Sequence, residues 1–122
     1  MQLTEHRHER ELFLRHADAD YVTVVDRRFD HSIVVGVDGV IEDFAPRTVA
    51  ELDGAAIARV LSLEPAVVLL GTGARAVFPP AAIAAEFLKR GIGIETMDNA
   101  AAARTFNVLV AEGRRVVAVF LL

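Results

Sequence analysis

Residues 67–73 read Val-Val-Leu-Leu-Gly-Thr-Gly, and this stretch decides the fold class of the 122-residue chain. Its continuous apolar run is typical of a strand that is covered on both faces of a sheet. The run ends in a glycine loop, and a helical pattern follows from residue 81. Residues 92–97 form the next strand pattern, which leads into a second polar loop and helix. Strand, helix and strand in this order predict a right-handed parallel βαβ unit.

Local signals set the ends of the second and third helices. Pro79 and Pro80 stand where the second helix begins, since proline is tolerated in a first helical turn. Gly91 is the expected left-handed residue behind that helix, and Asp98 or Asn99 is the expected cap of the third. The residues that we expect to be buried are Ile83, Phe87 and Leu88 on the second helix and Ala102, Phe106, Leu109 and Val110 on the third.

The first helix is predicted from a capping box, in which Thr48 is the cap and Glu51 stands at the third helical position. Gly54 is expected in the middle of this helix, where it weakens it. The residues expected on its buried face are Val49, Leu52, Ala56 and Val60. After the third helix and the turn Glu112-Gly113, residues 116–122 are apolar almost throughout, so we expect a central strand there.

The first half of the chain favours β-structure. Residues 21–25 are expected to form the first firm strand. Residues 32–37 and 40–44 flank Asp38-Gly39, which predicts a hairpin whose two turn residues both have positive φ. Residues 1–20 hold three of the four histidines and are expected to be a loosely held arm, with a short edge strand around 12–14.

Composition excludes several classes of protein. The 13 basic and 17 acidic residues give a net charge of −4 without a basic stripe, which disfavours nucleic-acid binding. The absence of cysteine excludes disulfides and thiolate metal sites. No apolar run approaches the about 20 residues of a membrane span. We therefore expect a cytoplasmic single domain over residues 1–122 without cofactor or metal, present as a monomer or weak homo-oligomer.

The glycine loop imitates a dinucleotide-binding fingerprint. Gly71, Gly73 and Ala76 have the spacing G-x-G-x-x-A after a strand, and Glu95 follows about twenty residues later. The fingerprint requires a helix that starts inside the glycine loop, whereas Pro79-Pro80 delays the helix here. A weaker alternative is a small anion held by the backbone amides of this loop and by a guanidinium. The third alternative is purely structural: the glycines permit a tight turn, and the arginine is solvated.

Polar residues at the ends of the two parallel strands predict one surface patch. Two carboxylates near an arginine suit acid–base chemistry, although caps and ion pairs are the more frequent use of such groups. His6 and His8 alternate as metal ligands on a strand do, but no third ligand lies near them. The nine residues of this strand-end patch are Gly71, Thr72, Gly73, Arg75, Glu95, Asp98, Asn99, Arg104 and Asn107.

The order and spacing of these motifs resemble a known family over essentially the whole chain. The chain is similar to the small Mth-type domain of unknown function, which includes a mitochondrial respiratory complex I assembly factor, an adipogenesis-associated mammalian protein and many short bacterial and archaeal proteins. The segments that carry the resemblance are Leu70-Gly71-Thr72-Gly73, Phe78-Pro79-Pro80, Gly91-Ile92-Gly93-Ile94-Glu95, Met97-Asp98, Arg104-Thr105-Phe106-Asn107 and Glu112-Gly113-Arg114-Arg115, with the 32–44 hairpin and Pro46-Arg47.

The resemblance implies a three-layer α/β fold. Its central mixed and mostly parallel sheet carries helices, a smaller β-hairpin layer comes from the N-terminal half, and the last strand runs antiparallel to the rest. It implies no enzymatic activity, since none is established for the class. Family members often have cysteine where Ala103 stands and tyrosine where Phe106 stands, so this chain lacks a thiol and a phenol that chemistry elsewhere would need.

Two hypotheses of function follow. The first is a non-enzymatic protein-binding or assembly factor, with a partner of unknown identity, that uses the strand-end patch. The second is a protein or enzyme that binds a small anionic metabolite at the same place. A metabolite site needs a concave pocket with converging polar groups, whereas a protein-binding site needs exposed apolar and arginine anchors.

Overall fold

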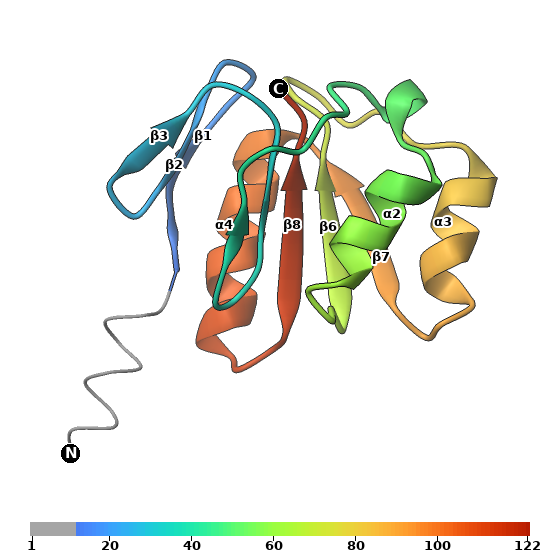
Figure 1. The fold of residues 1–122 in the computed structure, drawn as a ribbon. Helices are drawn as coiled ribbons and strands as arrows, with labels where there is room; N and C mark the ends of the chain where they lie inside the picture. Colours follow the sequence, from blue (N-terminus) through green and yellow to red (C-terminus); the bar gives the residue numbers. More distant parts are fainter. Residues whose placement is uncertain (1–11) are drawn as a thin grey trace.

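A computed structural model describes residues 12–122 and shows a central sheet with other elements packed on both of its faces (Figure 1). The strands are β1 (Leu14–Ala17), β2 (Val22–Val24), β3 (Arg27–Phe29), β4 (Ile33–Val35), β5 (Val40–Ile41), β6 (Val67–Gly71), β7 (Gly93–Met97) and β8 (Val116–Phe120). The helices are the short 3-10 helix η1 (Val49–Glu51), α2 (Gly54–Leu61), α3 (Ala81–Leu88) and α4 (Asn99–Ala111).

The central sheet is mixed, in the order β5-β4-β8-β6-β7. β6 runs parallel to β7 and to β8, while β4 runs antiparallel to β5 and β8. The prediction that the last strand is antiparallel to the rest is therefore wrong, because β8 is antiparallel to β4 alone. The reason is α4, which carries the chain back to the starting end of the sheet and so makes β8 parallel to β6.

Both faces of the sheet are covered, as expected for continuous apolar strands. Every residue of β8 is buried, and its side chains alternate between two apolar clusters. Phe120 and Ala118 pack toward α4 and the small sheet β1–β3, while Val117 and Val119 pack toward α2 and α3. The predicted three-layer α/β architecture with a central mixed sheet is confirmed.

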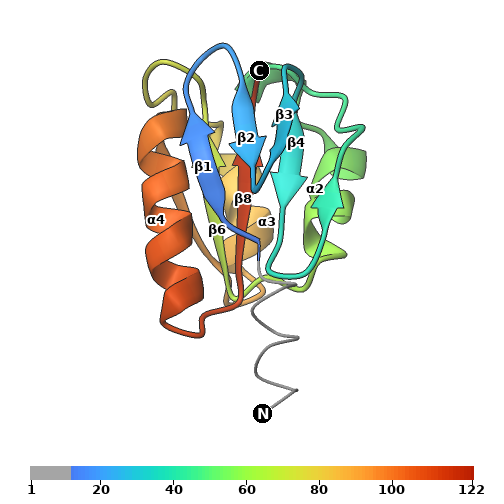
Figure 2. The same cartoon turned by 90° about the vertical axis from the view of Figure 1, so that its left-hand side faces the viewer.

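The predicted smaller β layer from the N-terminal half is confirmed. It is the antiparallel sheet β1-β2-β3, which lies in front of β8 and beside α4 (Figure 2). The 32–44 hairpin forms as β4 and β5 but joins the central sheet, because all of β4 is buried against β8. The strand at 21–25 is confirmed as β2, the edge strand begins at Leu14 rather than residue 12, and β3 was not predicted.

The turn of the β4–β5 hairpin is also longer than predicted. Neither Asp38 nor Gly39 has positive φ, so the two-residue turn inferred from Asp-Gly is wrong. Residues 36–39 form the loop instead, and the amide of Gly36 donates to the carbonyl of Gly39 at 2.8 Å. The side chain of Val37 packs against the apolar cluster, which draws this residue out of the strand and lengthens the loop.

The predicted capping box is wrong as well. Thr48 makes no side-chain cap, and residues 49–51 form a single 3-10 turn. Leu52 is extended because its side chain packs into the core, and this breaks the expected helix. α2 begins at Gly54, which was expected in the middle of the helix, and Asp53 caps it by accepting from the amide of Ala56 at 2.9 Å.

The second and third helices lie where the sequence predicts them. Pro80 precedes α3, Gly91 follows it with φ +76°, and Asp98 caps α4 by accepting from the amide of Ala101 at 2.7 Å. Leu88 was expected to be buried but is 58% exposed. The predicted burial of Phe87, its neighbour on this short helix, is confirmed.

The turn between β1 and β2 depends on the Asp18 carboxylate. It accepts hydrogen bonds from the amides of Asp20 and Tyr21 at 2.8 and 3.0 Å, and the His16 ring nitrogen lies 2.9 Å away. The Tyr21 amide, then His16 and the Asp20 amide, lower the pKa of Asp18 from 3.8 to about 2. Because the folded pKa lies below the unfolded one, this contribution to stability is complete above about pH 4 and is lost as the pH falls toward 2.

We therefore expect Asp18→Ala to lower the urea midpoint at pH 7. The difference from the wild-type chain should shrink as the pH falls from 4 to 2, where the wild-type carboxyl takes up its proton. Urea unfolding at a series of pH values measures this, with Asp26→Ala at the other end of β2 as the control. A difference that does not change with pH contradicts the assigned role.

Candidate functional site

The strand-end patch is held together by one buried amide. Asn99, at the first position of α4, is 0% exposed. Its Oδ1 accepts from the amide of Gly73 at 3.1 Å, and its Nδ2 donates to the carbonyls of Asp18 and Leu121 at 3.0 and 3.2 Å. The amide group therefore ties the glycine loop to the β1–β2 turn and to the end of β8.

Gly71 is glycine because of this amide. A Cβ atom built there would collide with Asn99 Oδ1 and would lie 3.0 Å from the carbonyl oxygen of Val119. Gly73 has φ +96°, a conformation that favours glycine. The fold alone thus explains why residues 71 and 73 are glycines. The helix that follows begins only at Ala81, so no helical amides lie in the glycine loop to bind a dinucleotide pyrophosphate.

The hydroxyl of Thr72 orders the long loop between β6 and α3. Thr72 Oγ1 donates to the carbonyl of Arg75 at 2.6 Å and accepts from the amide of Val77 at 2.9 Å. The Thr72 amide donates to the carbonyl of Met97 at 3.0 Å. We name residues 72–80 the Phe78 loop, after the aromatic residue that this network presents to solvent.

The rest of the strand-end patch is dispersed. Arg75, Glu95 and Arg104 are exposed, and Glu95 lies two residues before the end of β7. Asn107 is about 12 Å along α4 from Asn99. Its amide accepts from the Leu14 amide and donates to the Leu14 carbonyl, both at 2.8 Å, so that it docks β1 against α4. Gly71, Thr72, Gly73, Asp98 and Asn99 come together, and Asn107 does not join them.

The Phe78 loop carries the most exposed large apolar side chain in the described part of the chain. Phe78 is 76% exposed and Val77 beside it is 41% exposed. Pro79 and Pro80 restrict the backbone that follows. The sequence predicts Phe78 only as part of a helix junction, but an aromatic residue between a polar loop and two prolines also indicates an exposed anchor.

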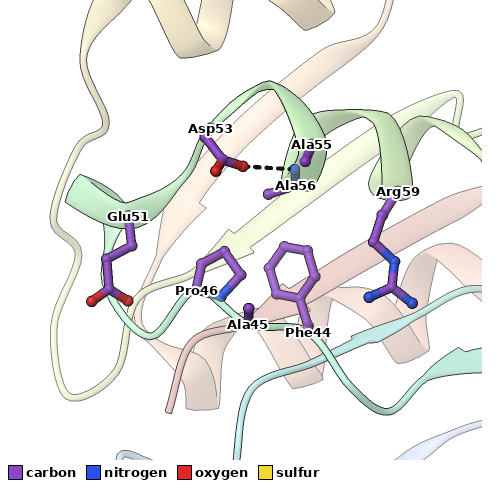
Figure 3. A pocket seen from close by; sticks show the side chains of 8 residues that line it. All are labelled: Phe44, Ala45, Pro46, Glu51, Asp53, Ala55, Ala56 and Arg59. Carbon is purple, nitrogen blue, oxygen red and sulfur yellow. Dashed lines mark hydrogen bonds between the residues drawn. The ribbon is translucent and has the colours of Figure 1, made fainter.

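A cavity of about 360 Å³ opens beside α2 at the same end of the sheet (Figure 3). Its apolar floor includes Phe44, which is 4% exposed, and Pro46 and Ala56. Charged side chains surround the floor, with Glu51 and Arg59 on opposite sides of it (Figure 3). The residues that line this α2 cavity are Phe44, Ala45, Pro46, Glu51, Asp53, Ala55, Ala56 and Arg59.

The charged side chains around the α2 cavity differ in their partners. Arg59 donates to the Asp43 carboxylate at 2.8 Å and to its carbonyl at 3.0 Å, and this guanidinium lowers the pKa of Asp43. Glu51 Oε1 accepts from the Arg47 amide at 2.7 Å, and Asp53 Oδ1 caps α2. Within residues 12–122, the two carboxylates on the acidic side of the cavity thus bond to backbone amides.

The sequence matches one protein family over nearly its whole length. Residues 14–121 match the family described as "Protein of unknown function (DUF498/DUF598)". The chain belongs to this family. A Xanthomonas campestris protein solved by NMR is 43% identical, with a TM-score of 0.83 and 90% of this chain and 83% of that chain covered. The structure of this DUF498/DUF598 member is thus shared across nearly its whole described length.

Two further relatives bear on the resemblance drawn from sequence. A Bordetella pertussis protein described as an Mth938-like domain is 28% identical, with a TM-score of 0.77 and 90% of this chain and 85% of that chain covered. This confirms the Mth-type resemblance. The "13 kDa major membrane protein" of Francisella tularensis subsp. holarctica (strain LVS) is 35% identical over 57 residues, which are 47% of this chain and 46% of that protein. The match thus spans less than half of that curated relative.

Residues 12–122 contain neither a membrane-spanning helix nor a metal-binding cluster. No helix there is long and apolar enough to cross a membrane. No group of three or more histidine, cysteine, aspartate or glutamate side chains is placed to hold a metal ion in that part of the chain. The possible metal ligands His6 and His8 lie outside the described residues.

The role of Asn99 gives a test. We expect Asn99→Ala to lower the free energy of unfolding by about 3 kcal/mol, because the Gly73 amide and two carbonyls lose their partner in a buried place. Asn107→Ala should cost about 1 kcal/mol, since the site is half-buried and water reaches it. Urea unfolding compares the two. A cost for Asn99→Ala below that for Asn107→Ala would contradict this view of the patch.

Proposed function

We propose that the protein is a non-enzymatic cytoplasmic protein-binding module, of the kind that serves in assembly, and that the Phe78 loop is its contact surface. The observation that carries the proposal is the 76% exposure of Phe78 on an ordered loop. Aromatic and arginine side chains supply most of the binding energy at protein interfaces. Phe78 and Arg75 provide both types within four residues.

The order of the loop supports the same function. Thr72 fixes the loop through bonds to Arg75 and Val77, and two prolines stiffen its end. A loop that is already ordered loses little conformational entropy when a partner binds. Val77 extends the apolar contact beside Phe78. The loop therefore combines an exposed anchor with the preorganisation that makes such an anchor effective.

The alternative of a small anion in the glycine loop has less support. The amides that would face an anion are already engaged, since Thr72 donates to Met97 and Gly73 donates to Asn99. The Asp98 carboxylate caps α4, and its negative charge at this place repels an anion. These pairings favour a structural use of the glycines and leave Arg75 and Phe78 for contact with a protein.

Site-specific photo-crosslinking tests the proposal. We expect benzoylphenylalanine at position 78 to yield cross-linked adducts of defined mass in cells of the organism that produces the protein. The reason is that a partner's side chains cover this ring in the complex. Fractionation before mass spectrometry also shows whether the adduct lies in the cytoplasm or at a membrane, which bears on the relative named as a membrane protein.

The matched control is benzoylphenylalanine at position 108. Val108 is 55% exposed on α4, so the probe is accessible there without lying on the proposed surface. Adducts at 78 but not at 108 support the proposal. Equal adducts at both positions, or none at 78, overturn it.

A further inference from the structure

The Phe78 loop and the α2 cavity lie at one end of the molecule. The loop leaves the carboxyl end of β6, and α2 runs back along the sheet toward the start of β6. The first residues of α2, which line the cavity, are therefore at the end where the loop emerges (Figure 1). An exposed aromatic side chain and a cavity with an apolar floor thus belong to the same end of one chain.

The two features match in size and polarity. The cavity holds about 360 Å³ over a floor of Phe44, Pro46 and Ala56, which is room for a phenylalanine side chain. Phe78 leaves most of its surface in water in the single chain. Entry of this side chain into the cavity of a partner removes apolar surface from water, which favours association.

The charges match as well. Arg75 stands on the loop that carries Phe78, and Glu51 and Asp53 stand at the rim of the cavity. Arg59, the cation of the same rim, is already paired with Asp43. A loop that enters the cavity thus brings a guanidinium to a side that holds two carboxylates and favours it.

We propose that the occupant of the α2 cavity is Phe78 of a second copy of this chain, which rests on the proposed function by making that copy the partner of the Phe78 loop. Since each chain carries the loop and the cavity at one end, a two-fold axis brings both pairs together at once. Phe78 of each copy enters the cavity of the other, and Arg75 meets Glu51 across the interface. Two small reciprocal contacts give a weak dimer.

Sedimentation velocity of the purified chain tests the dimer. We expect the dimer fraction to rise between about 10 µM and 1 mM. Phe78→Ala should weaken dimerisation about tenfold or more, because it removes the anchor. Ala55→Phe should do the same, because it fills the cavity from an exposed position on α2. Leu88→Ala removes another exposed apolar side chain and should change nothing.

A mixture of the Phe78→Ala and Ala55→Phe chains tests the loop and the cavity separately. The Phe78→Ala chain keeps its cavity, and the Ala55→Phe chain keeps its Phe78. Together they retain one of the two reciprocal contacts, so a mixed dimer should form more readily than either variant alone. Isotope-labelled chains with benzoylphenylalanine at 78 should cross-link between copies to residues 44–59. A mixture no more associated than its components, or cross-links elsewhere, overturns the proposal.

A charge exchange tests the pairing of Arg75 with Glu51. Arg75→Glu and Glu51→Arg should each weaken the dimer, and the double variant should recover most of the loss. A chain that stays monomeric at 1 mM overturns the second-copy proposal. In that case adducts of another protein at position 78 in cells leave the proposed function standing, whereas the absence of any adduct there removes both.

Discussion

The side-chain amide of Asn99 is the constraint on which the end of the sheet depends. Its oxygen and its nitrogen reach three segments that are distant in the sequence, the loop at Gly73, the turn at Asp18 and the strand end at Leu121. The residue is fully buried, so no water replaces a lost partner. This explains why Gly71 has no side chain, because a Cβ there would occupy the space of the amide oxygen. The small β-layer, the central sheet and α4 are thus fixed relative to one another at one point.

That constraint also decides what the polar residues at the strand ends do. In many α/β proteins this end of a parallel sheet binds ligands, because loops and helix starts leave amides free there. Here the amides of Thr72 and Gly73 are bound within the chain, and Asp98 satisfies the start of α4. These polar groups therefore form hydrogen bonds within the chain and stabilise the fold. What the loop offers outward is apolar and cationic, in Phe78 and Arg75, and such a surface suits a protein partner better than a metabolite.

Elements that depend on neighbouring residues could be predicted from the sequence, whereas those that depend on distant residues could not. Apolar runs and proline or glycine signals located β6, α3, β7, α4 and β8, since these depend on neighbouring residues. The capping box at Thr48 failed because burial of Leu52 outweighs a local cap. The strand β3 was missed because two of its three residues are exposed arginines, which hide the pattern. The bond of Asn107 to Leu14 joins residues 93 positions apart, and no local pattern indicates it. The strand-end patch stays a prediction as a site: Gly71, Thr72, Gly73, Asp98 and Asn99 lie together because they follow the ends of two paired strands, whereas Asn107 lies further along α4.

The α2 cavity shows how a failed local prediction leads to a functional surface. Had the helix begun at Val49, as the capping box predicted, its first turn would have continued into α2 without a break. The chain instead turns at Leu52 to bury that side chain, and α2 starts anew with Asp53 as its cap. The residues on both sides of this break, Glu51 and Asp53, line the cavity together with Arg59, and its floor with Phe44 lies between Glu51 and Arg59 (Figure 3). Packing of Leu52 against the core thus shapes the concave surface that we propose the Phe78 loop of a second chain fits.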